Sequence, residues 1–144
     1  MPNVLFQELG FPIMLVDPPM VQVRGETLPD INMADLQAAV FGLLVAKPSR
    51  LTGDEVKFIR KFLRLRQADL AEVLNMANHS VVSQWESRQA DSAGMDYNTE
   101  VLLRIWMASK QGHSAQVIDL LEHRLKRLRA ASAEPMAVSL PAAA

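Results

Sequence analysis

The residues from 52 to 86 constrain the fold more than any other stretch, because polar caps and apolar positions recur there at helical spacing. Thr52 and Glu55 are three positions apart in a capping-box pattern, which predicts a helix over residues 53–65. A second, shorter helix is predicted over residues 67–74. Two short helices in close succession favour a compact helical domain.

A third helix is predicted over residues 78–86, with Asn78 as its cap and Val82 facing inward. Its outer face carries small, polar, uncharged side chains, which we call the reading face: His79, Ser80, Ser83 and Gln84. Such groups donate and accept hydrogen bonds selectively, as the recognition of base-pair edges requires. The three helices together predict a helix-turn-helix DNA-binding protein, in which Asn78 and the reading face are the predicted DNA-binding residues of the third helix.

The stretch resembles the helix-turn-helix of the Cro/Xre family of phage-type repressors, over residues 52–108. The resemblance rests on a Gln-x-x-Leu-Ala motif followed by Val-Ser-x-Trp-Glu. The matching residues are Gln67, Leu70, Ala71, Leu74, Val82, Ser83, Gln84, Trp85 and Glu86. It implies that His79, Ser80 and Gln84 contact base edges, whereas Gln67 binds a phosphate at the start of the second helix. It also implies a structural ion pair between Arg60 and Glu86.

The chain departs from the family pattern in two places. Gln67 and Glu86 are 19 positions apart, one more than usual, and we place the extra residue in the turn at 75–77. The glycine that follows Trp-Glu in the family is replaced by Ser87. These departures leave open a further interpretation, in which a degenerate module has lost DNA binding and only dimerises.

The formal net charge of −1 by itself argues against DNA binding, but the charge is distributed unevenly along the chain. Residues 1–49 carry two basic and five acidic residues, a net charge of −3. Residues 50–90 carry seven basic and five acidic residues, a net charge of +2, which fits phosphate neutralisation around the reading face. Arg66 and Arg88 flank the motif and are predicted to contact phosphates, although a solvated charged face explains the same count.

The N-terminal region, residues 1–49, is predicted to form a strand pair and a helix that serve in dimerisation or partner binding. The β-prone runs 12–16 and 20–24 are predicted to pair as a hairpin, and a helix capped by Asn32 is predicted over 32–46. With the helix-turn-helix domain over 50–111, this predicts a mainly α fold. The predicted fold is a five-helix repressor-like helix-turn-helix domain with a small N-terminal β-hairpin and helix extension.

The last two helices are predicted over 98–107 and 116–129. Residues 112–129 are predicted to form a C-terminal helix with a role in dimerisation, because apolar residues recur there at coiled-coil spacing. Residues 130–144, rich in Ala with Ser and Pro, are predicted to be a disordered tail.

Several classes of function are disfavoured by what the chain lacks. The absence of cysteine excludes disulfides, thiol catalysis and thiolate-held zinc. His113 and His123 have no metal-ligand spacing, and no phosphate loop or catalytic arrangement is present, so we predict neither an enzyme nor a bound metal or cofactor. No signal peptide and no apolar run near the ~20 residues of a membrane span are found, which predicts a cytoplasmic protein.

The predicted function is a dimeric transcriptional regulator, most simply a repressor, that inserts helix 78–86 into the major groove of double-stranded DNA. Two copies are expected on half-sites about one helical turn apart. The wider arrangement also resembles antitoxin-type regulators with a small N-terminal β unit, although the zinc-binding cysteines of some of them are missing here. This implies an alternative function, an antitoxin whose acidic N-terminal third binds a toxin protein and which regulates its own gene pair.

Overall fold

The computed structural model describes residues 3–112 and 128–140, which contain five helices and five strands. Two compact units are present: a terminal unit from Met1–Val40 and Glu134–Ala144, and a helical unit from Phe41–Ala133. The prediction of a mainly α fold is wrong, because the described residues form two small sheets in addition to the helices. The chain has a small mixed α/β fold.

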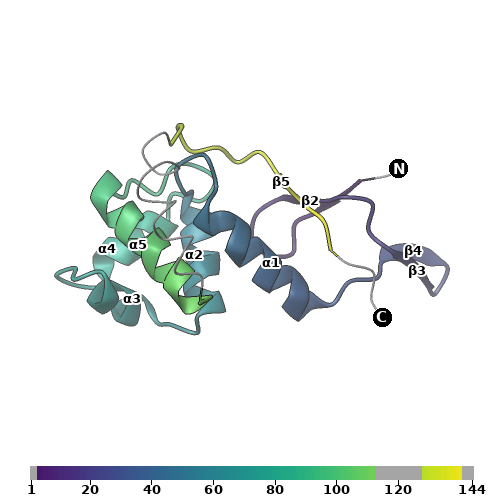
Figure 1. The fold of residues 1–144 in the computed structure, drawn as a ribbon, viewed down its shortest axis with the longest axis horizontal. Coiled ribbons are helices and arrows are strands. Elements are labelled where there is room, and N and C mark those ends of the chain that lie inside the picture. Colours follow the sequence, from purple (N-terminus) through teal and green to yellow (C-terminus); the bar gives the residue numbers. More distant parts are fainter. Residues whose placement is uncertain (1–2, 113–127, 141–144) are drawn as a thin grey trace. The chain divides into compact units, whose positions relative to one another are not determined.

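The first sheet of the terminal unit has the strand order β1-β2-β5. Strand β1 (Val4–Phe6) pairs antiparallel with β2 (Ile13–Leu15), and β5 (Met136–Val138) pairs parallel with the other edge of β2 (Figure 1). The prediction of a disordered tail over 130–144 is therefore wrong at 136–138. Val138 is buried, and burial of this apolar side chain together with the backbone hydrogen bonds of the sheet stabilises the strand.

The second sheet is a hairpin of β3 (Met20–Val23) and β4 (Glu26–Pro29). The predicted pairing of 12–16 with 20–24 is wrong, because each run pairs with a different neighbour. Arg24 and Gly25 have φ values of 52° and 82°. A two-residue turn with positive φ at both positions matches the twist of antiparallel strands, so the chain turns back at once after β3.

The helices lie where the capping and periodicity signals predicted them, within a few residues. They are α1 (Met33–Val45), α2 (Gly53–Phe62), α3 (Gln67–Val73), α4 (Ser80–Glu86) and α5 (Tyr97–Lys110). Helix α2 ends before the predicted position 65, because Arg64 takes a left-handed conformation with φ 59°. The helix predicted over 116–129 lies largely outside the described residues, as do His113 and His123.

The core of the helical unit is apolar and is shared by α2 to α5. Its fully buried side chains include Val56, Ile59, Leu70, Val82, Leu103 and Met107. The rings of Phe41 and Phe62 stack with centroids 4.6 Å apart, which joins the end of α1 to the end of α2. Within the ranges that the structure describes, no helix is long and apolar enough to cross a membrane.

Candidate nucleic-acid interface

The start of α4 is fixed by Asn78, as the sequence predicted. The Asn78 Oδ1 atom accepts a hydrogen bond from the backbone N–H of Ser80 at 2.9 Å and another from the Ser80 hydroxyl. His79 already has helical backbone angles, with φ −70° and ψ −16°, so Asn78 occupies the cap position. The cap turns the chain sharply into α4 after the turn that follows α3.

The reading face of α4 is open to solvent. His79, Ser80, Ser83 and Gln84 are all exposed, whereas Val82 and Trp85 on the opposite side are buried. The side chains of His79, Ser83 and Gln84 form no hydrogen bond with another described residue. Their donors and acceptors are therefore available to a ligand, and the contacts with base edges stay a prediction.

The far end of α4 is held by the ion pair that the resemblance implied. Arg60 Nε donates to Glu86 Oε2 at 2.6 Å and Arg60 Nη2 donates to Glu86 Oε1 at 3.0 Å, a bidentate pairing of two hydrogen bonds. Arg60 Nη1 also donates to the carbonyl of Leu65 at 3.0 Å. One guanidinium thus joins α2, the end of α4 and the chain just before α3.

Gln67 lies beside this ion pair and adds to it. Its Nε2 donates to Glu86 Oε1 at 3.3 Å, and the side chain is half-buried. A phosphate contact by Gln67 stays a prediction. Because one amide hydrogen is directed to Glu86, a phosphate would have to use the second.

Arg66, the other predicted phosphate contact at the start of α3, is paired within the protein. Its Nε and Nη2 donate to the two carboxylate oxygens of Asp69 at 3.1 and 3.0 Å, although 83% of the Arg66 side chain is exposed. The hydrogen bonds from Arg66 lower the pKa of Asp69. The carboxylate therefore stays charged at neutral pH, and its contribution to stability is lost only as the pH falls through this lowered pKa.

The remaining positive charge around α4 comes from fewer residues than the sequence count suggested. Arg50 and Arg60 are each paired with a buried carboxylate, and Arg66 is paired with Asp69. Within residues 50–90, four exposed basic residues have no ion pair with another described residue: Lys57, Lys61, Arg64 and Arg88. Arg88 follows α4 directly, and its guanidinium lies against Gly94.

Helix α4 ends directly against the start of α2, at Gly53. A Cβ atom at Gly53 would lie 2.5 Å from the carbonyl oxygen of Trp85 and 2.7 Å from the backbone nitrogen of Gln89. The backbone N–H of Gly53 also donates to the carbonyl of Asp91 at 3.1 Å. Only a residue without a side chain permits this approach, so Gly53 helps to set the position of α4.

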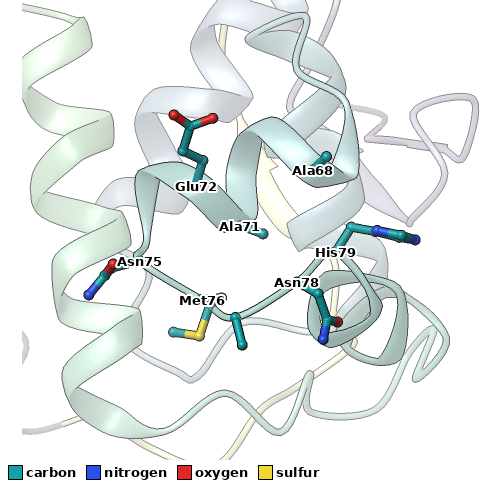
Figure 2. A pocket seen from close by; sticks show the side chains of 8 residues that line it. Ala68, Ala71, Glu72, Asn75, Met76, Asn78 and His79 are labelled. Carbon is teal, nitrogen blue, oxygen red and sulfur yellow. The ribbon is translucent and has the colours of Figure 1, made fainter.

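A shallow hollow of about 320 Å³ lies between α3 and the turn that leads to α4 (Figure 2). Its apolar lining consists of three alanines and a methionine: Ala68, Ala71, Met76 and Ala77. Asn78 and His79 stand at its edge, on the side of α4. The hollow therefore adjoins the reading face.

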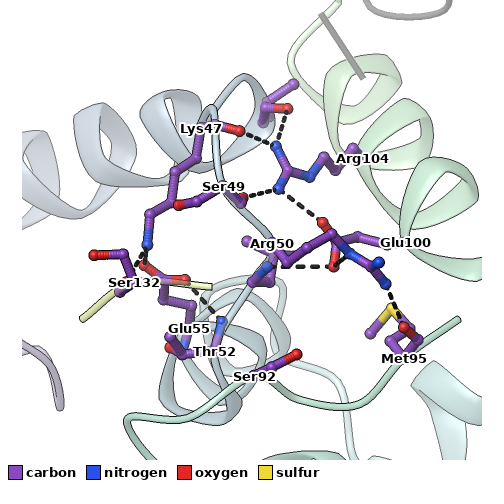
Figure 3. Close-up of polar contacts among 12 residues, drawn as sticks. Lys47, Ser49, Arg50, Thr52, Glu55, Ser92, Met95, Glu100, Arg104 and Ser132 are labelled. Atoms are coloured by element: carbon purple, nitrogen blue, oxygen red, sulfur yellow. Dashed lines mark hydrogen bonds and ion pairs between the residues drawn. The ribbon is translucent and has the colours of Figure 1, made fainter. Parts of the chain in front are cut away.

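A buried polar cluster on the linker between α1 and α2 was not predicted from the sequence (Figure 3). Arg104 is fully buried on α5 and its Nη2 donates to Glu100 Oε2 at 2.8 Å and to the carbonyl of Ser49 at 2.6 Å. Its Nη1 donates to the carbonyl of Lys47 at 2.6 Å. Burial lowers the pKa of Arg104, and the charge of Glu100 opposes this shift. The signal in the sequence was an acid and a base four positions apart among apolar residues of one helix.

A second buried ion pair in this cluster joins Lys47 to Glu55. Their Nζ and Oε2 atoms are 2.5 Å apart, and only 5% of each side chain is exposed. Glu55 also completes the capping box, because its Oε1 accepts a hydrogen bond from the backbone N–H of Thr52 at 2.9 Å. Lys47 Nζ further donates to the carbonyl of Ser132 at 2.9 Å. The cluster positions the start of α2.

No three His, Asp or Glu side chains in the described ranges lie close enough together to hold a metal ion. No family model, curated protein or solved structure matches the chain. The geometry of α3, α4 and the residues that hold them is therefore the basis for a functional proposal.

Proposed function

We propose that this chain is a sequence-specific DNA-binding transcriptional regulator that acts as a homodimer and inserts α4 into the major groove. The observation that carries the proposal is the reading face, four exposed polar side chains of which His79, Ser83 and Gln84 form no hydrogen bond with another described residue. The major groove is wide enough to admit an α-helix, and its base edges present distinct patterns of donors and acceptors. One short helix covers few base pairs, so two copies on adjacent half-sites supply specificity.

The way in which α4 is held supports this proposal. The Arg60–Glu86 ion pair and the close approach of Gly53 fix one end of α4, and the Asn78 cap fixes the other. A recognition element that is already ordered loses less conformational entropy when it binds. The unpaired Lys57, Lys61, Arg64 and Arg88 supply positive charge for the phosphates.

The first test replaces His79 and Gln84 separately by Ala, in the full chain. Each substitution is expected to weaken binding to a duplex selected from a random DNA pool by about 1–3 kcal/mol, because each removes hydrogen bonds to a base edge. Fluorescence anisotropy at fixed salt measures the loss. Gln22→Ala, an exposed glutamine on β3, is the matched control and should leave affinity unchanged. Unaltered affinity and sequence preference in both α4 variants would refute the assignment of this helix.

The second test concerns the Arg66–Asp69 ion pair. Asp69→Asn is expected to tighten binding to any duplex by a few-fold, because it frees the Arg66 guanidinium and removes a negative charge near the phosphates. Asparagine keeps an oxygen that can accept from the Arg66 backbone, so the helix cap is retained. The slope of log affinity against log salt should steepen by about 1. Equal or weaker binding by Asp69→Asn would show that Arg66 does not contact DNA.

A second candidate function is that of an antitoxin that binds a basic toxin protein and regulates its own gene pair. The observation that favours it is the β3–β4 hairpin, on which four apolar side chains are 40–46% exposed: Met20, Val21, Val23 and Leu28. Exposed apolar residues grouped on one element are typical of surfaces that bind a protein. Co-purification with a small basic protein encoded by the adjacent gene tests it. The candidate fails if the adjacent gene encodes no such protein or if the two proteins do not associate.

A further inference from the structure

The hollow between α3 and the α3–α4 turn combines an apolar floor with a polar edge. Ala68 and Ala71 come from α3, whereas Met76 and Ala77 come from the turn (Figure 2). Ala68 and Ala77 are exposed, so the floor is open to a group that approaches α4 from solvent. Alanine side chains in this position are suited to contact with a methyl group.

On the side of α4, the polar edge of this floor offers a hydrogen-bond donor, whereas Glu72 and Asn75 line the hollow on the side away from Asn78 and His79 (Figure 2). Asn78 Oδ1 already accepts hydrogen bonds from the backbone N–H and the hydroxyl of Ser80. The Nδ2 group of Asn78 has no partner among the described residues, and it can only donate. A ligand that contacts both the alanine floor and Asn78 Nδ2 must therefore present an acceptor beside an apolar group.

Among the four bases, thymine alone presents this combination in the major groove, with its O4 acceptor beside its C5-methyl group. Cytosine presents an N4 donor and no methyl group, and adenine and guanine present no methyl group. The 5-methyl derivative of cytosine would fill the hollow but would bring its donor against the donor of Asn78. The geometry thus distinguishes thymine from cytosine and from 5-methylcytosine.

We propose that each copy of the protein reads one thymine at this hollow, with the thymine methyl group against Ala68, Ala71 and Ala77 and the thymine O4 accepting from Asn78 Nδ2. This inference rests on the proposed DNA-binding function and adds a base identity to it. Removal of one buried methyl group corresponds to roughly a fourfold loss of affinity, and removal from both half-sites to a loss on the order of 15-fold.

The experiment uses the full chain and a duplex selected from a random DNA pool, in which each thymine in turn is replaced by deoxyuridine in both half-sites. One position is expected to show the loss on the order of 15-fold, because deoxyuridine differs from thymidine only by the methyl group. At that position, 5-methylcytosine paired with guanine should bind no better than deoxyuridine. The proposal would be overturned if every duplex with deoxyuridine bound as tightly as the original thymine duplex. It would also be overturned if the duplex with 5-methylcytosine bound as tightly as the thymine duplex.

A protein variant locates the effect in the hollow. Ala68→Gln places a longer side chain in it at an exposed helical position, so the variant should fold and should no longer distinguish thymine from uracil. Val73→Gln changes an exposed residue of the same helix that does not line the hollow, and it should keep the preference. If Ala68→Gln still bound thymine DNA more tightly than uracil DNA, the thymine methyl group would not lie in this hollow. A DNA pool that yields no preferred sequence would instead refute the proposed function itself.

Discussion

Replacement of Arg104 by Met is expected to lower the free energy of unfolding by about 3–5 kcal/mol, the largest effect of any single change that we predict. Methionine has a similar length but no charge, so among the described residues the buried Glu100 would keep only one cation beside it, the partly exposed Arg50, and the backbone N–H of Leu51 as a neutral donor. The carbonyls of Lys47 and Ser49 would also lose a charged donor at 2.6 Å. Urea denaturation followed by circular dichroism measures the loss.

Two further variants separate the buried charge from general effects of the substitution. Arg66→Met makes the same change in an exposed ion pair and should leave the free energy of unfolding nearly unchanged, because water screens that pair. Adding Glu100→Gln to Arg104→Met should recover part of the stability, because it removes the uncompensated carboxylate. If Arg104→Met and Arg66→Met were equally stable, water or a rearranged Arg50 would have to replace the buried guanidinium.

The helix positions could be predicted from the sequence because helix signals act over a few residues. The capping box of Thr52 and Glu55 and the caps at Asn32 and Asn78 are all present in the structure. Asn75, a residue type that readily takes the left-handed conformation, follows α3 with φ 56°. Each of these features depends on hydrogen bonds between residues at most three positions apart in the sequence.

The parts of the fold that were missed depend on residues far apart in the chain. Strand β5 is stabilised by its pairing with β2, more than a hundred positions away, and by the burial of Val138, so nothing in its own three residues indicated a strand. Arg104 was missed for the same reason, because its acceptors lie on the linker before α2. Tertiary contacts of this kind outweigh local preference, and they account for the mixed α/β fold.

The candidate site shows the same division between local and distant interactions. Helical periodicity correctly placed His79, Ser83 and Gln84 on the exposed side of α4. It gave no information on which charges are already paired, so Arg66 was counted as free although Asp69 holds it. Exposure follows from spacing along one helix, whereas the available charge depends on geometry between side chains.

Replacement of Gly53 by Ala is expected to lower the free energy of unfolding by about 3 kcal/mol, at the upper end of the usual effect of overpacking. The added methyl group would meet the carbonyl oxygen of Trp85 and the backbone nitrogen of Gln89, neither of which can rotate away. Gly42→Ala is the matched control. Its nearest neighbour is the flexible side-chain amide of Gln111 at 3.2 Å, and alanine favours the α1 helix by up to about 1 kcal/mol.

Because Trp85 belongs to α4, Gly53→Ala also tests how the reading face is positioned. Under conditions in which the variant is folded, the shift of α4 should weaken binding to the selected duplex more than binding to random DNA. Base contacts depend on the angle of the helix in the groove, whereas the exposed basic side chains can follow the phosphates. An equal loss on both duplexes would mean that α4 adjusts freely, and the close approach at Gly53 would then serve stability alone.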